Sequence, residues 1–164
     1  MKPLGHFEPH NKAANACYFS PSGDYCVSVS LDDTVKTFAY HPENIKCETP
    51  SFDHLNNNSH TRYLDTLRHN NFTGRWLSAF KPAFDPKRSA TFALGSMLQP
   101  RRIEIYSVAT PRDTSVSSKR ALSVDLVANL TSECLASVNS RLCFHATAEA
   151  VLGSNSSGKV HLFR

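Results

Sequence analysis

Residues 19–38 read Phe-Ser-Pro-Ser-Gly-Asp-Tyr-Cys-Val-Ser-Val-Ser-Leu-Asp-Asp-Thr-Val-Lys-Thr-Phe, and residues 144–163 repeat the pattern as Phe-His-Ala-Thr-Ala-Glu-Ala-Val-Leu-Gly-Ser-Asn-Ser-Ser-Gly-Lys-Val-His-Leu-Phe. The two stretches align over 20 residues without a gap. A third copy runs from Phe84 to Tyr106, with three additional residues in its second turn. Self-similarity of this kind is the sequence signature of a repeat architecture.

Each copy contains the same series of strands and turns. A polar turn follows the leading phenylalanine, then a strand rich in small residues, a second polar turn, and a short β-branched strand that closes on an aromatic residue. A further strand is predicted before each copy, at residues 2–7, 63–69 and 122–129. Four strands per unit make the blade of a β-propeller. A chance alternation in another all-β sandwich is the alternative, but it does not explain why the aromatic positions coincide.

The sequence therefore predicts an all-β fold, a WD-repeat β-propeller fragment of about three four-stranded blades. We assign the blades to residues 1–40, 63–108 and 122–164, and the polar, Asn/Ser/Pro-rich inserts to residues 41–62 and 109–121. The inserts are expected to be surface loops. A ring needs at least four blades, so we expect a piece of a longer chain or a ring completed by a partner. Alone, such a piece would expose apolar sheet faces.

Composition narrows the class of protein. Hydrophobic residues make up 40% and charged residues 20% of the 164, and the net charge is +4, which is ordinary for a soluble globular protein. No apolar stretch approaches the ~18 residues of a membrane span, and no secretory signal is evident, so an intracellular protein without a membrane partner is expected. The five cysteines form no CxxC pair and no zinc spacing. Four of them lie in strand-like runs and are expected to behave as small hydrophobes.

Catalytic motifs are missing from the sequence. The eight histidines are scattered, and no HExxH, P-loop or Gly-x-Ser-x-Gly elbow occurs. No pair of carboxylates has the look of an acid/base couple. We therefore expect a binding platform that is not an enzyme, with no cofactor, no metal and no small-molecule substrate.

One family resemblance rests on specific strings. Residues 69–77 read His-Asn-Asn-Phe-Thr-Gly-Arg-Trp-Leu, and Phe-Asp-Pro-Lys at 84–87, Gly-Ser-Met at 95–97 and Pro-Arg-Arg-Ile-Glu at 100–104 follow, with Gly-Ser-Asn-Ser-Ser-Gly-Lys-Val-His at 153–161. Together they resemble the C-terminal blades of the WD repeat-containing protein 76 family, over essentially the whole chain. That family includes the fungal "changed mutation rate" protein and is related to the WD-repeat subunit of the damage-specific DNA-binding complex.

The resemblance implies a nuclear, seven-bladed propeller that binds double-stranded DNA or chromatin in the DNA-damage response. It also implies a substrate receptor that joins cullin-4 ubiquitin ligases through their propeller adaptor. The adaptor-binding box of such receptors has the form Trp-Asp-x-Arg. The matching positions here read Phe-Ala-Tyr-His at 38–41, Tyr-Ser-Val-Ala at 106–109 and Phe-Arg at 163–164, so no box is intact. In the related damage-binding subunit, the stretch that matches residues 69–76 is a hairpin that probes the duplex, and it is two residues longer here.

A candidate interface follows from the reversal of the chain at every turn of a meander. Residues 69–76 should then lie at the same end of a blade as residues 95–102. Arginines grip phosphates or read guanine edges, and aromatic rings stack on bases. The predicted DNA-binding residues are Phe72, Arg75, Trp76, Arg101, Arg102 and Lys159.

Other interpretations of these residues stay open at this point. Trp76 packs under its neighbouring loop in one of them, and Arg101 and Arg102 form an ordinary solvated turn in another. Basic residues exceed acidic ones by only one over all the turns at this end: Lys12, Arg75, Arg101, Arg102 and Lys159 against Glu8, Asp32, Asp33 and Glu133. The alternative function is a protein-only WD-repeat scaffold whose Arg/Trp loop binds an acidic peptide.

Overall fold

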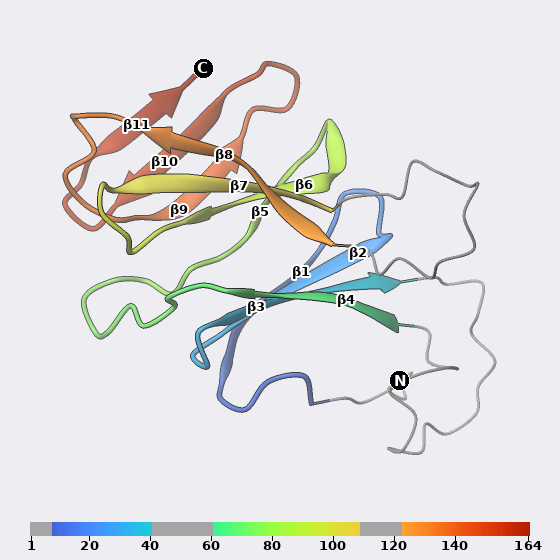
Figure 1. Ribbon diagram of the computed structural model, residues 1–164. Helices are drawn as coiled ribbons and strands as arrows, with labels where there is room; N and C mark the ends of the chain where they lie inside the picture. The colour runs from blue at the N-terminus through green and yellow to red at the C-terminus, as the bar shows by residue number, and fades with distance from the viewer. Residues whose placement is uncertain (1–7, 41–60, 109–122) are drawn as a thin grey trace, which may run out of the picture.

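The computed structural model describes residues 8–40, 61–108 and 123–164, which form three antiparallel β-sheets (Figure 1). The first sheet contains β1 (Ala14–Phe19), β2 (Tyr25–Ser30), β3 (Thr34–Tyr40) and β4 (Thr61–Arg68), in that order. The second contains β5 (Ala83–Asp85), β6 (Arg88–Gly95), β7 (Arg102–Val108) and β8 (Val124–Thr131). The third contains β9 (Asn139–Phe144), β10 (Val151–Asn155) and β11 (Val160–Phe163). The predicted all-β repeat is confirmed.

Strand register shows that the three copies are the same unit. In each copy one residue of the central strand pairs with both the leading and the closing aromatic residue. Cys26 lies between Phe19 and Phe38, Phe92 between Phe84 and Tyr106, and Val151 between Phe144 and Phe163. The coincident aromatic positions of the sequence therefore mark equivalent positions of the three sheets.

The sheets differ from the predicted blade boundaries by one strand. The strand before the second copy is β4, and it pairs with β3 of the first sheet, from Tyr40 opposite Thr61 to Thr34 opposite Arg68. In the same way β8 pairs with β7. A sequence repeat fixes the period and not the phase of the unit, because backbone pairing decides which sheet a strand joins. The strand predicted at 2–7 lies outside the described residues, and within them the third sheet has three strands.

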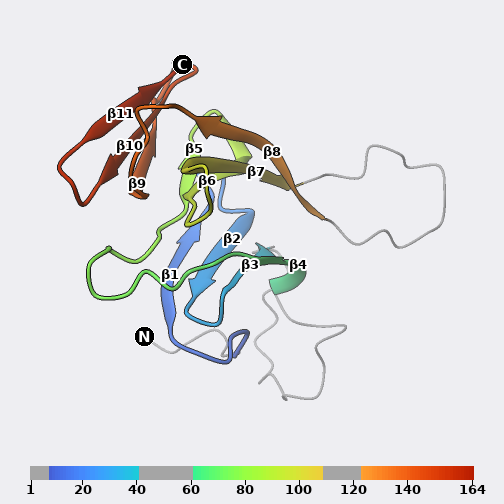
Figure 2. The same ribbon diagram turned by 60° about the vertical axis from the view of Figure 1, so that its left-hand side comes forward.

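The sheets stack face to face, with the second between the other two, as two views of the ribbon agree (Figures 1 and 2). Large apolar side chains fill the space between them, and the most deeply buried are Phe80, Phe92, Leu94, Ile103, Val27, Val29 and Val35. The small residues of the central strands allow close approach. A Cβ atom on Gly95 would lie 1.8 Å from the Asn139 carbonyl oxygen, and one on Gly153 would lie 2.9 Å from the Ile103 side chain. Glycine at both positions therefore sets the spacing of the second and third sheets.

Polar contacts at the β5–β6 turn also join neighbouring sheets. The Arg88 guanidinium pairs with Glu149 at 2.8 Å, and Lys87 Nζ donates to the His145 carbonyl at 3.1 Å. In the other direction, the Ser22 amide donates to Ser89 Oγ at 3.0 Å. One turn of the second sheet thus holds both of its neighbours.

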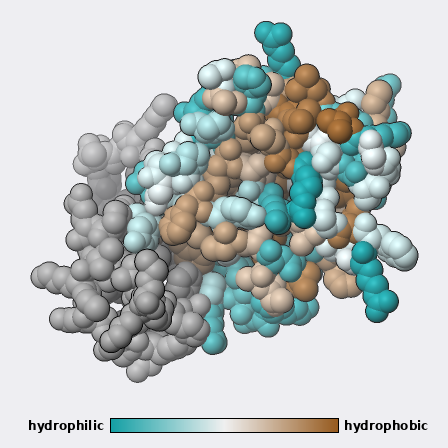
Figure 3. All heavy atoms as spheres, turned by 180° about the vertical axis from the view of Figure 1, so that it is seen from behind, coloured by the Kyte–Doolittle hydropathy of each residue, from teal (hydrophilic) through white to brown (hydrophobic). Residues whose placement is uncertain are grey.

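The outer face of the third sheet is apolar and exposed. Leu152, Val160 and Leu162 are 44%, 62% and 72% exposed. Hydrophobic side chains gather at this end of the molecule when it is seen from behind (Figure 3). This is the exposed sheet face that the sequence predicts for an incomplete stack of blades. No helix capable of crossing a membrane occurs among the described residues.

Candidate nucleic-acid interface

The candidate interface is the segment between β4 and β5, and Asn71 fixes its start. The Asn71 side chain is 1% exposed, and its amide donates to the carbonyl oxygens of Ser30 and Thr34 at 2.9 and 3.0 Å. Its backbone amide donates to Asp33 Oδ1 at 2.9 Å. These contacts hold the segment against the β2–β3 turn of the first sheet. In the sequence Asn71 is one residue of a polar stretch, and only the structure shows that it joins two turns.

The tip that follows carries the exposed aromatic rings. Gly74 has a φ of 63°, in the left-handed region that glycine adopts without strain, and the chain reverses there. Phe72 is 70% exposed and Trp76 is 90% exposed. Trp76 therefore does not pack under a neighbouring loop. Arg75 is also exposed and forms no ion pair within the described residues.

The arginines of the β6–β7 turn are held by their own sheet. Arg102 Nε lies 2.8 Å from Glu104 Oε1, in an ion pair of which the Glu104 side chain is 5% exposed. Arg101 Nη1 donates to the Met97 carbonyl. Residues 69–76 and 95–102 contain no acidic residue, but Glu104 lies in β7, two residues beyond the second of these stretches, and its side chain reaches back. Of the two, Arg102 thus has its charge largely offset.

Glu104 also connects the two loops where they leave the sheets. Its Oε2 accepts a hydrogen bond from the Tyr106 hydroxyl at 2.7 Å and lies 3.6 Å from His69 Nε2. Burial alone would raise the pKa of Glu104, but hydrogen bonds from Tyr106 and Arg102 outweigh it and lower the pKa. Burial, followed by the bond to Glu104, raises the pKa of Tyr106. The ionised Glu104 therefore links His69, where the exposed segment begins, to Arg102.

Lys159 lies in the β10–β11 turn of the third sheet. Its backbone amide donates to Asn155 Oδ1 at 3.0 Å, and its side chain is exposed without an ion pair in the described part of the chain. The structure therefore presents Phe72, Arg75 and Trp76 together on one tip, and Lys159 on a different turn. Arg101 and Arg102 have partners within their own sheet.

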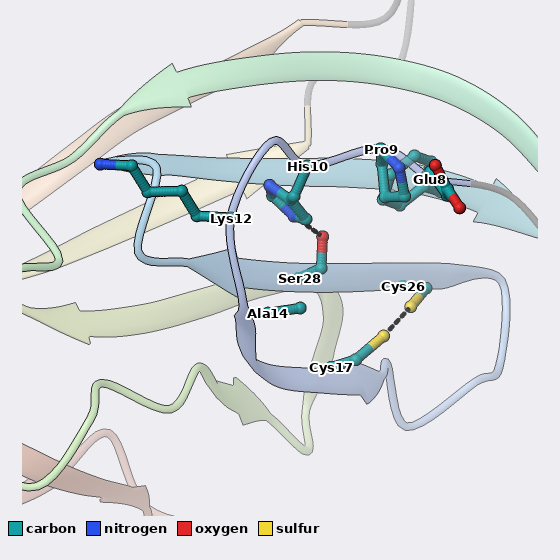
Figure 4. A pocket seen from close by; sticks show the side chains of 9 residues that line it. Glu8, Pro9, His10, Lys12, Ala14, Cys17, Cys26 and Ser28 are labelled. Carbon is teal, nitrogen blue, oxygen red and sulfur yellow. Dashed lines mark hydrogen bonds between the residues drawn. The ribbon is translucent and has the colours of Figure 1, made fainter.

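The first sheet contains a second polar network, which the sequence does not reveal. His10 Nε2 lies 2.7 Å from Ser28 Oγ (Figure 4). On the other side of the ring, His10 Nδ1 lies 3.0 Å from Asp32 Oδ2. Burial alone would raise the pKa of Asp32, but hydrogen bonds from Thr34, His10 and the Asn11 amide lower it to about 2. The order Ser–His–Asp resembles a catalytic triad, but Ser28 is only 4% exposed. We interpret the network as a structural one that holds the segment before β1 on the sheet.

Metal-binding clusters and family models give no further indication of function. No group of three or more His, Cys, Asp or Glu residues in the described ranges is arranged to hold a metal ion. No protein-family model matches the chain.

Individual relatives do match over nearly the whole chain. WD repeat-containing protein 76 of Mus musculus is 35% identical over 163 residues, which is 99% of this chain and 22% of the relative. The Xenopus laevis protein of the same name is 32% identical over 163 residues, or 99% of this chain and 23% of the relative. DNA damage-binding protein cmr1 of Emericella nidulans is 27% identical over 164 residues, or 98% of this chain and 27% of the relative.

These matches cover nearly all of this chain but only part of each relative. The chain spans between 22% and 27% of the length of these curated relatives. The similarity runs through all three sheets and includes the segment that carries Arg75 and Trp76. Over the part that it shares with these relatives, the chain is a homologue of WD repeat-containing protein 76 built from WD-repeat blades.

Proposed function

We propose that this chain is a non-catalytic WD-repeat protein of the DNA-damage response that binds DNA through the tip formed by Phe72, Arg75 and Trp76. The observation that carries the proposal is the exposure of two large aromatic rings, at 70% and 90%, on either side of an unpaired arginine. Two large aromatic rings exposed together on one tip form an apolar surface patch, and such patches commonly mark interaction sites. The name of the fungal relative, a DNA damage-binding protein, supports DNA as that partner.

The chemistry of the tip suits nucleic acid. Arg75 offers five N–H donors in a planar fork that matches a phosphate, and phosphate contacts supply affinity without sequence preference. Phe72 and Trp76 supply flat apolar surfaces for stacking on bases that are unpaired or splayed. The bonds of Asn71 hold the start of the tip in place, which lowers the entropy cost of binding. Lys159 and Arg101 are secondary contacts in this proposal, and Arg102 serves mainly to neutralise Glu104.

A cellular location and a protein partner can be proposed as well. We propose that the protein binds chromatin in the nucleus and, as the family resemblance implies, that it acts as a receptor subunit of a cullin-4 ubiquitin ligase. The adaptor would not bind through the positions that match its box in the first two copies, because Phe38 and Tyr106 are 4% and 7% exposed. We therefore propose that any adaptor contact lies elsewhere.

DNA binding by single-residue variants tests the proposal. We expect Arg75→Ala to weaken binding of the whole 164-residue chain to labelled duplexes of any sequence, and to reduce the slope of log affinity against log salt by about one. Trp76→Ala should weaken binding to a duplex with unpaired bases by roughly 5- to 150-fold, since stacking is worth about 1–3 kcal/mol per base. Fluorescence anisotropy at several salt concentrations measures both effects.

Lys81→Ala is the matched control, because Lys81 is an exposed cation between β4 and β5 that lies outside the tip. It should leave both affinity and salt slope close to those of the parent chain. An acidic peptide serves as competitor in the same assay. The proposal is contradicted if Arg75→Ala and Trp76→Ala bind DNA as the parent does. Loss of peptide binding alone would favour the protein-only scaffold.

A further inference from the structure

Two cysteine side chains meet on the outer side of the first sheet. Cys17 on β1 and Cys26 on β2 are diagonal neighbours, since Cys17 is opposite Ser28 and Phe19 is opposite Cys26. Their Sγ atoms are 3.2 Å apart, and both thiols are free. Figure 4 shows the two sulfur atoms pointing toward each other. They line a pocket of about 290 Å³, so a small reagent can reach them.

The thiol–thiol contact activates one of the two sulfurs. A hydrogen bond from Cys26 lowers the pKa of Cys17 to about 7, while burial acts in the opposite direction. The same contact, together with burial, raises the pKa of Cys26. Cys17 is exposed and Cys26 is buried, so the more acidic thiol is also the more accessible one. The nucleophile in thiol chemistry is the thiolate.

Among the groups that line the pocket, Cys26 is the one placed to stabilise a Cys17 thiolate. His10 is engaged with Ser28 and Asp32. Figure 4 shows the amino group of Lys12 turned away from the two sulfurs. The nearest source of stabilisation for a Cys17 thiolate is therefore the S–H group of Cys26.

We propose that Cys17 and Cys26 form a peroxide-reactive dithiol site, which closes to a reversible disulfide. The Cys17 thiolate attacks one oxygen of hydrogen peroxide and displaces hydroxide, so that the sulfur is oxidised to sulfenic acid and the peroxide is reduced. The Cys26 thiol then attacks the sulfenic sulfur. A sulfur–sulfur bond forms, the sulfur–oxygen bond breaks, and the hydroxyl leaves as water with the proton of Cys26.

The register explains why this disulfide should be easily reduced. Diagonal neighbours on paired strands have Cα atoms about 7–8 Å apart, whereas disulfides favour about 4.4–6.8 Å. Closing the bond from the present sulfur separation therefore requires a small shift of β1 along β2. Strained disulfides have more oxidising potentials and exchange readily with glutathione. The sequence predicts that these cysteines behave as small hydrophobic residues, and the proposal adds a redox role for Cys17 and Cys26.

Mass spectrometry of the peroxide-treated chain tests the proposal. The experiment uses the whole chain with the substitutions Cys47→Ser, Cys134→Ser and Cys143→Ser, so that Cys17 and Cys26 are the only cysteines left. Trypsin releases both cysteines on one peptide, residues 13–36. After peroxide and then alkylation, this peptide should be lighter than the reduced form by two hydrogen atoms and free of alkyl groups. Reduced glutathione should restore alkylation at both positions.

The rate of Cys17 alkylation at pH 7 gives a second measurement. Cys26→Ala removes the thiol that donates to Cys17, so a smaller fraction of Cys17 is thiolate at pH 7. A thiolate of higher pKa is more nucleophilic, but this offsets only part of the loss. We therefore expect alkylation of Cys17 to slow by roughly fivefold. Cys17→Ala, at an exposed position, should leave Cys26 resistant to peroxide. Circular dichroism confirms that each variant is folded.

Three results would overturn the proposal: no disulfide after peroxide in the folded chain, a disulfide that forms equally fast in urea, or an unchanged alkylation rate in Cys26→Ala. The equal rate in urea would mean that proximity in sequence, and not the fold, brings the thiols together. None of these results bears on DNA binding by Phe72, Arg75 and Trp76.

Discussion

Gly95→Ala is expected to be the most damaging single substitution in this chain, with a loss of about 3 kcal/mol or more in the free energy of unfolding. The new Cβ atom would lie 1.8 Å from the Asn139 carbonyl oxygen and 2.9 Å from the Phe80 ring. Neither neighbour can yield easily, because one is backbone of β9 and the other is 1% exposed. The second and third sheets would have to separate. Urea unfolding followed by circular dichroism measures the change.

Gly158→Ala is the control for this prediction. Gly158 has a φ of 74°, and a Cβ atom there would meet nothing within 4 Å. Alanine should cost only the left-handed backbone penalty, about 1–2 kcal/mol. If Gly95→Ala is no more destabilised than Gly158→Ala, the sheets are not in the close contact that the structure shows.

Asn71→Ala is expected to have the second-largest effect, a destabilisation of about 3 kcal/mol, since buried partners are left unsatisfied at about 1–3 kcal/mol each. The carbonyl oxygens of Ser30 and Thr34 would lose their Asn71 donor, and His69 Nδ1 would lose its contact with Asn71 Oδ1 at 2.6 Å. The same urea titration measures it.

The neighbouring residue provides a matched comparison. Asn70 is exposed, and its side chain accepts one hydrogen bond, from the Phe72 amide at 3.1 Å. Asn70→Ala should therefore cost less than about 1.5 kcal/mol. Equal effects at the two positions would show that Asn71 does not join the exposed segment to the first sheet.

The parts of this structure that are encoded locally could be predicted from the sequence. The aromatic residues that bound each copy are visible in the sequence, and the register confirms that they occupy equivalent positions. The exposure of Phe72 could also be anticipated, because it lies in a polar stretch rich in turn-forming residues. For Trp76 the sequence left packing under the neighbouring loop open, and only the structure shows that the ring is exposed. Short-range periodicity and turn chemistry carry this information.

Features that depend on pairing across the fold were not accessible. Nothing local reveals that β4 joins the first sheet, since either neighbour offers a suitable ladder. The partner of Arg102 is Glu104, which is close in sequence but lies in β7 and not in the turn, so the turn residues alone do not reveal the ion pair. The Cys17–Cys26 contact depends on the β1–β2 register and on a turn of defined length. These contacts depend on strand pairing and tertiary structure, which a local sequence pattern does not specify.

The central claim is that the three sheets stack as blades and thereby place the exposed tip at their rim. Ser78, two residues beyond Trp76, and Ser140 on β9 test it directly, because their hydroxyl oxygens are 2.8 Å apart although 62 residues separate them in sequence. In a chain whose five native cysteines are replaced by serine, the pair Ser78→Cys and Ser140→Cys should form a disulfide under mild oxidation. Non-reducing mass spectrometry detects it. The account predicts nearly complete cross-linking in the folded chain and little in urea. A folded chain whose two thiols stay separate would contradict it.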